Sequence, residues 1–435
     1  MSLSDLARLT RRATAASDDG PSRSRIKRRH AIAVALDAAL VLTPLAVGGV
    51  ILGGLLSGGT SLGSADVAVF AAAAILLSLA VGLGPVRSRV ASRAGRPVIA
   101  QSTRQARLRV IMFLALVVVL LALASLAIGS RALGIGEVLT ALLPPYGEST
   151  TDAALIVREL RAPRTVLGLA VGAALGVAGA TIQGHTRNPL ADPGLLGVSA
   201  GATCAVVLGI FVLGLSTPLE YIWLAFAGAL LASLAVFTVA AVSGGSSPLT
   251  LILTGAVLSA ILASVTSAIV LIDEASFDVY RFWVVGSLAG RDSDILLPLL
   301  PFIVAGLILA LACAPGLNLL ATGGDVARAL GLNVTVHRML GIASITLLAG
   351  AATAACGPIG FIGLVAPHVA RALVGNDYRW SLPVAALSGA ALLLAGDVVG
   401  RVVARPAELQ VGIVVALIGA PFLVALIRRR KLTQL

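Results

Sequence analysis

The sequence has little charge and almost no lysine. Charged residues make up 12% of its 435 residues, about half of the share in a soluble globular domain, whereas hydrophobic residues make up 58%. A soluble chain of this composition could not cover its surface with polar groups. The composition therefore excludes a water-soluble enzyme and indicates a membrane protein.

The scarcity of lysine, cysteine and histidine excludes further classes of site. The two lysines, Lys27 and Lys431, lack the glycine-rich context of a P-loop, so the chain is not itself an ATPase of that type. The three cysteines form no C-x-x-C pair, and the four histidines are scattered. We therefore predict no disulfide framework, no metal site and no cofactor. No cluster of catalytic residues is visible, so a membrane-embedded enzyme is not favoured.

Basic residues are the charges that the sequence does have, with a net charge of +12. They form short clusters beside apolar runs, which is typical of membrane topology signals and not of a nucleic-acid-binding face. Residues 1–30 form a basic tail, which we expect in the cytosol. Residues 31–107 contain two apolar segments and a basic linker, and seven arginines lie from position 87 to position 109. This pattern predicts an extra transmembrane hairpin that returns to the cytosol.

The rest of the chain, residues 108–430, is the predicted core domain. It contains ten apolar segments, at 110–129, 164–183, 194–214, 219–242, 249–272, 295–319, 339–356, 359–374, 381–400 and 408–427. With the hairpin, these give an all-α polytopic protein with about 12 transmembrane helices. The positions of the charge clusters predict a multi-pass protein of the cell membrane. They place both termini in the cytosol.

Prolines interrupt the chain at similar places in its two halves. Pro189 and Pro193 follow one apolar segment, and Pro358 and Pro367 mark a comparable place later. Such paired breaks are typical of an internal repeat around a translocation path. Small residues in apolar segments have a second explanation, because glycine and alanine allow helices to approach closely in any bundle.

Several motifs closely resemble the signature of the FecCD family, the permease subunits of ABC importers for ferric siderophores, haem and cobalamin. The first block comprises Arg161-Ala162-Pro163-Arg164, Gly172 to Gly176, Gln183, Arg187 to Pro193 and Gly197 to Ala202. The later blocks comprise Arg281-Phe282-Trp283, Gly286 to Leu288, Ala327 to Leu332, Gly357 to Leu364, Pro367-His368 and Asp397 to Arg401. The resemblance covers roughly residues 108 to 430 and leaves the N-terminal hairpin as a departure from the family.

The resemblance implies a permease that is paired with a second permease, as a homodimer or heterodimer, within the lipid bilayer. Cytosolic ATPase subunits would drive it, and an extracytoplasmic binding protein would deliver the substrate. In the family, glutamates of the binding protein contact permease arginines, and the matching residues are Arg161, Arg164 and Arg401. Guanidinium groups suit bidentate carboxylate contacts. The alternative is local pairing, with Asp397 available four residues before Arg401.

The resemblance also implies a coupling segment at the cytosolic side. The glycines at 323, 324 and 331 predict a short helix between them, and a second short turn is expected around 333–337. The expected ATPase contacts are Asp325, Val326, Ala327, Arg328, Leu330, Gly331 and Leu332. An ordinary connecting loop is the alternative.

In the family, the helix that begins around 246–248 lines the translocation path, so the resemblance implies a path and a cytoplasmic gate there, and the helix breaks at 188–193 are assigned to the same path. The residues concerned are Ser246, Ser247, Pro248, Thr254, Asn188, Pro189 and Pro193, and the serines and threonine would serve equally as helix caps. The segment from Phe277 to Arg291 is expected to form a short interfacial helix.

These features favour an importer permease without catalytic activity, which moves a ferric siderophore or related iron chelate. An ion-gradient-driven secondary transporter is the alternative. Such carriers usually place acidic residues or histidine near the middle of the membrane, and Asp37 in the extra hairpin is the only acid well inside a predicted span.

Overall fold

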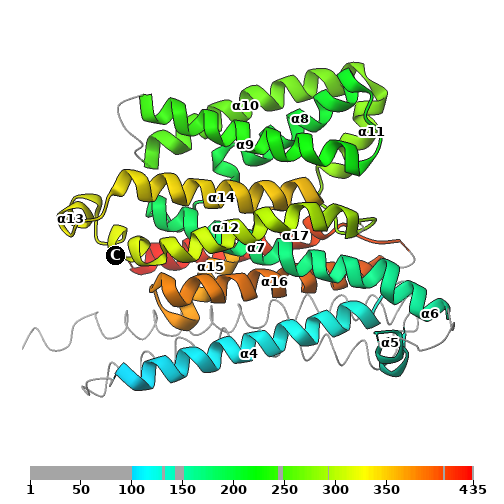
Figure 1. The fold of residues 1–435 in the computed structure, drawn as a ribbon, viewed down its shortest axis with the longest axis horizontal. Helices are drawn as coiled ribbons and strands as arrows, with labels where there is room; N and C mark the ends of the chain where they lie inside the picture. Colours follow the sequence, from blue (N-terminus) through cyan, green and yellow to red (C-terminus); the bar gives the residue numbers. More distant parts are fainter. Residues whose placement is uncertain are drawn as a thin grey trace, which may run out of the picture. The chain divides into compact units, whose positions relative to one another are not determined.

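The structure is a computed structural model that describes residues 100–129, 133–142, 151–242, 248–291, 293–404 and 407–433. The predicted N-terminal hairpin, the predicted gate residues Ser246 and Ser247, and the basic tail lie outside this part of the chain. All regular elements in the described part are helical (Figure 1). The prediction of an all-α protein is therefore confirmed for it.

The helices follow one another with short connections. In chain order they are α4 (Ala100–Ala127), α5 (Ile135–Leu142), α6 (Asp152–Leu155), the π-helical turn η1 (Ile156–Arg161), α7 (Ala162–Thr186), the 3-10 turn η2 (Pro193–Leu196), α8 (Val198–Leu213), α9 (Pro218–Val242), α10 (Pro248–Ile272), α11 (Glu274–Trp283), α12 (Ser293–Leu320), α13 (Gly324–Ala329), α14 (Val334–Cys356), α15 (Ile362–Val374), α16 (Tyr378–Val403) and α17 (Val411–Thr433).

Seven of these helices are long and apolar enough to cross a membrane, and three shorter apolar helices accompany them. Together they coincide with the ten segments predicted for the core. Because short turns join successive spans, neighbours in the sequence run in opposite directions (Figure 1). The start of α4 and the end of α17 consequently lie at the same end of the helices, beside α13. We call this the α13 end and the opposite one the Arg401 end.

Helix α7 lies at the centre and packs against α12, α14, α15 and α16. Glycines on α7 allow the close approach: a Cβ on Gly172 would lie 2.6 Å from the carbonyl oxygen of Gly389, and one on Gly179 would overlap the backbone of Gly363. Helices α8, α9 and α10 form a second group, in which Gly201 and Gly228 meet back to back. The small residues thus serve helix packing, as one of the two explanations predicted.

Two local predictions were wrong. The residues around 333–337 do not form a separate turn, because Asn333 caps α14 by accepting a hydrogen bond from the Val336 amide at 3.2 Å. The helix expected from Phe277 to Arg291 is α11, which begins at Glu274 behind the cap residue Asp273 and ends at Trp283. Turns follow it, because Ser287 donates its amide to the carbonyl of Cys356 and so leaves the helical ladder.

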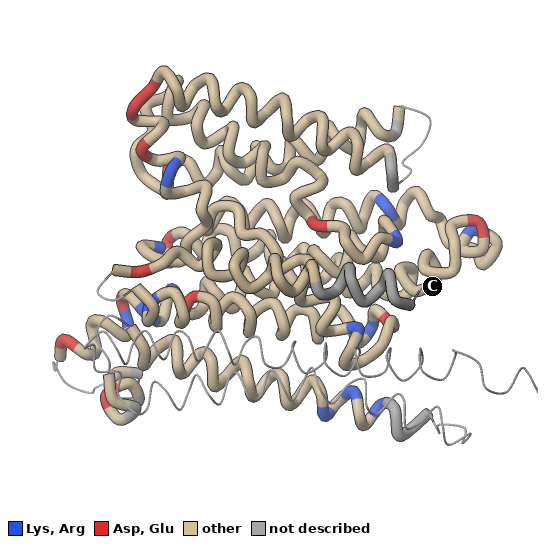
Figure 2. Tube along the Cα trace, turned by 180° about the vertical axis from the view of Figure 1, so that it is seen from behind, with Lys and Arg blue, Asp and Glu red and all other residues tan. Residues whose placement is uncertain are grey.

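Most charged residues lie near the two ends of the helices, and the stretches between the ends are largely uncharged (Figure 2). The α13 end carries mostly arginine, at positions 104, 107, 109, 187, 328, 338, 371 and 379. The Arg401 end carries most of the acids, at positions 137, 152, 159, 220, 273, 274, 278, 294, 397 and 408. By the positive-inside rule, this asymmetry favours the cytosol at the α13 end.

Candidate functional site

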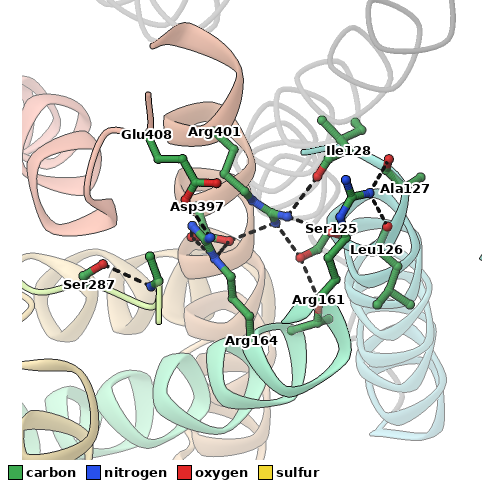
Figure 3. A network of polar contacts seen from close by, with 12 residues as sticks. Ser125, Leu126, Ala127, Ile128, Arg161, Arg164, Ser287, Asp397, Arg401 and Glu408 are labelled. Atoms are coloured by element: carbon green, nitrogen blue, oxygen red, sulfur yellow. Dashed lines mark hydrogen bonds and ion pairs between the residues drawn. The ribbon is translucent and has the colours of Figure 1, made fainter. Parts of the chain in front are cut away.

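The Arg401 end contains a polar network that joins α4, α7, α16 and the loop after α16 (Figure 3). Arg161, the last residue of the π-helical turn η1, directs its guanidinium towards the end of α4. Its Nη1 donates to the carbonyl oxygens of Leu126 and Ala127, both at 2.8 Å. These carbonyls belong to the last turn of α4 and have no partner within the helix. Arg161 therefore caps α4 and places a cation at the negative end of its dipole.

Arg401 approaches the same helix end from α16. Its Nη1 donates to the carbonyl oxygens of Ser125 at 2.8 Å and Ile128 at 2.9 Å. Its Nη2 donates to the Ser125 hydroxyl at 2.6 Å, and that hydroxyl is hydrogen-bonded to Thr165 of α7. The side chain of Arg401 is only 2% exposed. Two arginines thus hold four consecutive carbonyls at the end of α4, those of residues 125–128.

Asp397 connects Arg401 to the third arginine. Its Oδ2 pairs with Arg401 Nη2 at 2.9 Å, one helical turn away on α16. Its Oδ1 accepts from Nη2 of Arg164 at 2.7 Å, and Nε of Arg164 approaches both carboxylate oxygens at 3.1 Å. The local pairing of Arg401 with Asp397 that the sequence allowed is therefore present. A buried carboxylate between two arginines is compensated, whereas an unpaired one would be strongly unfavourable.

Glu408 completes the network from the loop between α16 and α17. Its Oε2 lies 2.7 Å from Nη1 of Arg164, and its side chain is 31% exposed. Beside it is a cleft of about 410 Å³, lined by Gly129, Ile156, Leu160, Arg161, Arg164, Leu288, Ala289, Gly290, Arg291, Arg401 and Glu408. The structure thus brings together all three arginines that were predicted to dock a partner, and it adds Glu408 and Arg291, which no sequence motif had singled out.

The opposite end presents the short helix α13. Ala327 is fully buried and packs in a small cluster with Leu320 and Val334, while Leu332 covers its edge. Val326 and Leu330 point outwards and are 49% and 62% exposed. Arg328 forms an exposed ion pair with Asp325 at 2.9 Å. The helix is closed by Gly331, whose φ of 87° is left-handed, so the glycine-bounded short helix was predicted correctly.

The residues predicted to line the path come from two segments that touch. Asn188 and Pro189 form the turn after α7, and Pro193 opens η2. A Cβ on Gly255 of α10 would overlap the Leu195 carbonyl oxygen, which places α10 directly against η2. Thr254 lies next to this contact and is half-buried, whereas only the backbone of Pro248 is described.

A buried arginine contact fixes the turn between α7 and η2. Gln183 of α7 donates to the carbonyl oxygens of Ala191 at 3.3 Å and Gly363 at 3.2 Å, and it accepts from Arg371 of α15 at 2.7 Å. Asp192 caps η2 by accepting from the Gly194 amide at 2.8 Å. Burial raises the pKa of Asp192, and the bond from Gly194 opposes this shift.

The ten apolar helices of the described residues, with charge mostly near their ends, define a multi-pass α-helical membrane protein. The sequence matches the FecCD transport family over residues 114–429. The chain belongs to this family of transport permeases.

The chain is similar in sequence to permeases whose names give different substrates. The chain is 48% identical to the ferric enterobactin transport system permease protein FepD of Escherichia coli (strain K12), over 70% of this chain and 91% of that protein. It is 38% identical to the hemin transport system permease protein HmuU of Yersinia pestis, over 73% and 95%. A solved ABC transporter chain assigned to the metal-chelate type, in an inward-facing conformation, superposes with a TM-score of 0.65 at 30% identity, over 74% and 99%.

Proposed function

We propose that this chain is the membrane permease of a binding-protein-dependent ABC importer that moves a ferric siderophore or related iron chelate into the cytoplasm. Separate ATPase subunits power the movement, and the permease itself catalyses no covalent reaction. The observation that supports this most strongly is the separation of two surfaces. An arginine-rich cleft lies at the acidic Arg401 end, and an exposed apolar helix lies at the basic α13 end.

The α13 end is proposed to face the cytosol and to bind the ATPase. Helix α13 is anchored below by Ala327, so a force on its exposed residues passes to the ends of α12 and α14. Val326 and Leu330 supply apolar contact area, and the exposed ion pair of Arg328 and Asp325 lies on the same short segment. An exposed apolar pair on a helix that lies outside the candidate spans suits a protein partner better than water.

We propose that an extracytoplasmic binding protein docks at the Arg401 end. Acidic side chains of the binding protein would contact the arginines of this end. Arg161, Arg164 and Arg401 create a positive cleft, and such charges orient a partner and speed its approach more than they stabilise the complex. Because Arg161 and Arg401 are engaged with α4, Arg164 is the arginine of the three that is best placed to contact a partner. The other two hold the rim of the cleft in position.

A second permease is proposed to pack against α10, which exposes most of its surface in the single chain. Its exposed positions include Ala256, Ala260, Ser264 and Ala268. Small residues spaced by four allow close helix contact within a membrane. The path would then run between two copies of α10, beside Thr254, η2 and the turn at Asn188 and Pro189.

The substrate class is supported by the relatives, whose names give ferric enterobactin, hemin, Fe(3+)-citrate and cobalamin. All four are bulky chelates of a metal. Within the described residues, no group of three or more His, Cys, Asp and Glu side chains could hold a metal ion. We therefore propose that the iron passes as an intact chelate.

Replacement of Arg161 and Arg164 by glutamate tests the docking arrangement. We expect weaker docking of the substrate-loaded binding protein and slower uptake, while the ATPase subunits still co-purify with the permease. Unchanged docking would contradict the assignment of this end.

A further inference from the structure

Arg164 holds two carboxylates of different character. Asp397 is 2% exposed and lies within α16, where Nε and Nη2 of Arg164 reach it. Glu408 is 31% exposed and lies on a loop, where only Nη1 of Arg164 reaches it, at 2.7 Å. The first contact belongs to the packed interior, and the second lies at the surface of the cleft.

The other two arginines of the network cannot readily change partners. Arg161 and Arg401 donate to four backbone carbonyls at the end of α4. Removal of Arg161 would take away the donor to the Leu126 carbonyl, and removal of Arg401 would take away the donor to those of Ser125 and Ile128. Within the described residues, Arg164 donates to no backbone group and holds only side-chain carboxylates. Its Nη1 is therefore the position in the network at which an outside carboxylate could enter at little cost.

The cleft beside Glu408 has the charge that an outside carboxylate requires. Four arginines line it, at positions 161, 164, 291 and 401, and they face the two carboxylates of Asp397 and Glu408. Arg291 has no ion-pair partner among the residues that the structure describes. The excess of positive charge remains even with Glu408 in place.

The backbone around Glu408 is held by hydrogen bonds from neighbouring residues, whereas its side chain is held by its ion pair with Arg164. The amide of Leu409 donates to the Gly400 carbonyl at 3.0 Å, and the amide of Gly412 donates to the Gly286 carbonyl at 3.1 Å. The side chain of Glu408 can therefore leave Arg164 by rotation alone, without unfolding of the loop.

We propose that Glu408 occupies the place of the partner's carboxylate on Arg164 in the undocked permease, and that docking exchanges one carboxylate for the other. This inference rests on the proposed docking function and adds a way in which docking is regulated. Glu408 keeps Arg164 extended towards the cleft and at the same time competes with the partner. The competition lowers the affinity of docking, which favours release of the binding protein after delivery.

The test uses the full transporter in lipid nanodiscs and the purified binding protein, loaded with its substrate, as the probe. The dissociation constant is measured for the wild type, for Glu408→Gln and for the control Glu274→Gln, which removes an exposed acid from the same end. An exposed ion pair of this kind predicts roughly three- to fivefold tighter docking for Glu408→Gln. The control should dock as the wild type does. Unchanged or weaker docking of Glu408→Gln would overturn the proposal.

The variant Arg164→Gln separates this inference from the docking function itself. If Arg164→Gln docks as tightly as the wild type, the assignment of Arg164 to docking fails, and the exchange fails with it. If Arg164→Gln docks weakly and Glu408→Gln docks no tighter, only the exchange fails. We expect weak docking of Arg164→Gln and no added effect of Glu408→Gln in the double variant, because the competition needs Arg164. Thermal unfolding of each variant checks that the fold is retained.

Discussion

Asp397 lies between Arg164 and Arg401, with its two carboxylate oxygens 2.7 Å and 2.9 Å from the Nη2 atoms of these residues. This arrangement ties α7 to α16 at the end where two arginines also cap α4. The contact therefore stabilises the three helices and fixes the orientation of Arg164 in the cleft.

Replacement of Asp397 by asparagine should destabilise the protein. Two buried guanidinium groups would lose their shared counter-ion, and the loss of one member of a buried pair costs about 3–5 kcal/mol. Denaturant unfolding in detergent measures this change. The control Asp278→Asn breaks an exposed pair with Arg281, for which about 1 kcal/mol or less is expected. An equal loss in the free energy of unfolding for both substitutions would show that the Asp397 network stabilises the protein no more than an exposed ion pair does.

Replacement of Gly179 by alanine should weaken the packing of α7 on α15. The added Cβ would overlap the backbone of Gly363, so the helices must separate, at a cost of about 1–3 kcal/mol. The matched control is Gly136→Ala, because nothing lies within 4 Å of a Cβ there. A lower unfolding temperature is expected for the first variant alone. A Gly179→Ala protein as stable as the wild type would contradict the packing described for α7.

Replacement of Leu330 by glutamate should release the ATPase subunits. The charge would stand on the exposed apolar surface of α13 without affecting the buried Ala327 below it. Co-purification of the ATPase with the tagged permease measures the effect. The control Thr335→Glu adds the same charge to an exposed position in the first turn of α14 and should leave the complex intact. Full retention of the ATPase by the Leu330 variant would remove α13 from the proposed interface.

Acidification should loosen the start of α11. The neighbouring Ser276, whose amide donates to Oδ2 of Asp273 at 2.8 Å, holds the pKa of Asp273 below its ordinary value of 3.8. A lowered carboxylate pKa stabilises the folded state above the unfolded pKa, and this contribution is lost as the pH falls through the folded pKa. Hydrogen exchange of the Ser276 amide should therefore accelerate below about pH 4, after correction for intrinsic exchange. Asp273→Asn keeps a cap that does not titrate and should remove this acceleration.

The spans could be predicted from the sequence because hydrophobicity alone determines them. Ten apolar segments were located, and each corresponds to a helix. The short helix α13 was also predictable, because glycines bound it on both sides. The start of α14 was wrongly predicted as a separate turn. The cap residue Asn333 is equally typical of a short turn and of the start of a long helix.

The partners of the arginines could not be predicted in full. Asp397 and Arg401 are one helical turn apart, so their pairing was visible as an alternative. The contact of Arg164 with Glu408 joins residues 244 positions apart, and the carbonyls that hold Arg161 belong to a different helix. Such contacts depend on the tertiary packing of α4, α7 and α16. The hydrophobic pattern of the sequence does not specify this packing.

The central claim is that the permease is a passive conduit moved by a separate ATPase. It is tested most directly in sealed vesicles that contain the permease, with the loaded binding protein on one side. The account predicts accumulation of the iron chelate only when the ATPase subunits and ATP are present on the other side. Accumulation driven by a proton or sodium gradient without the ATPase would contradict it and favour a secondary transporter.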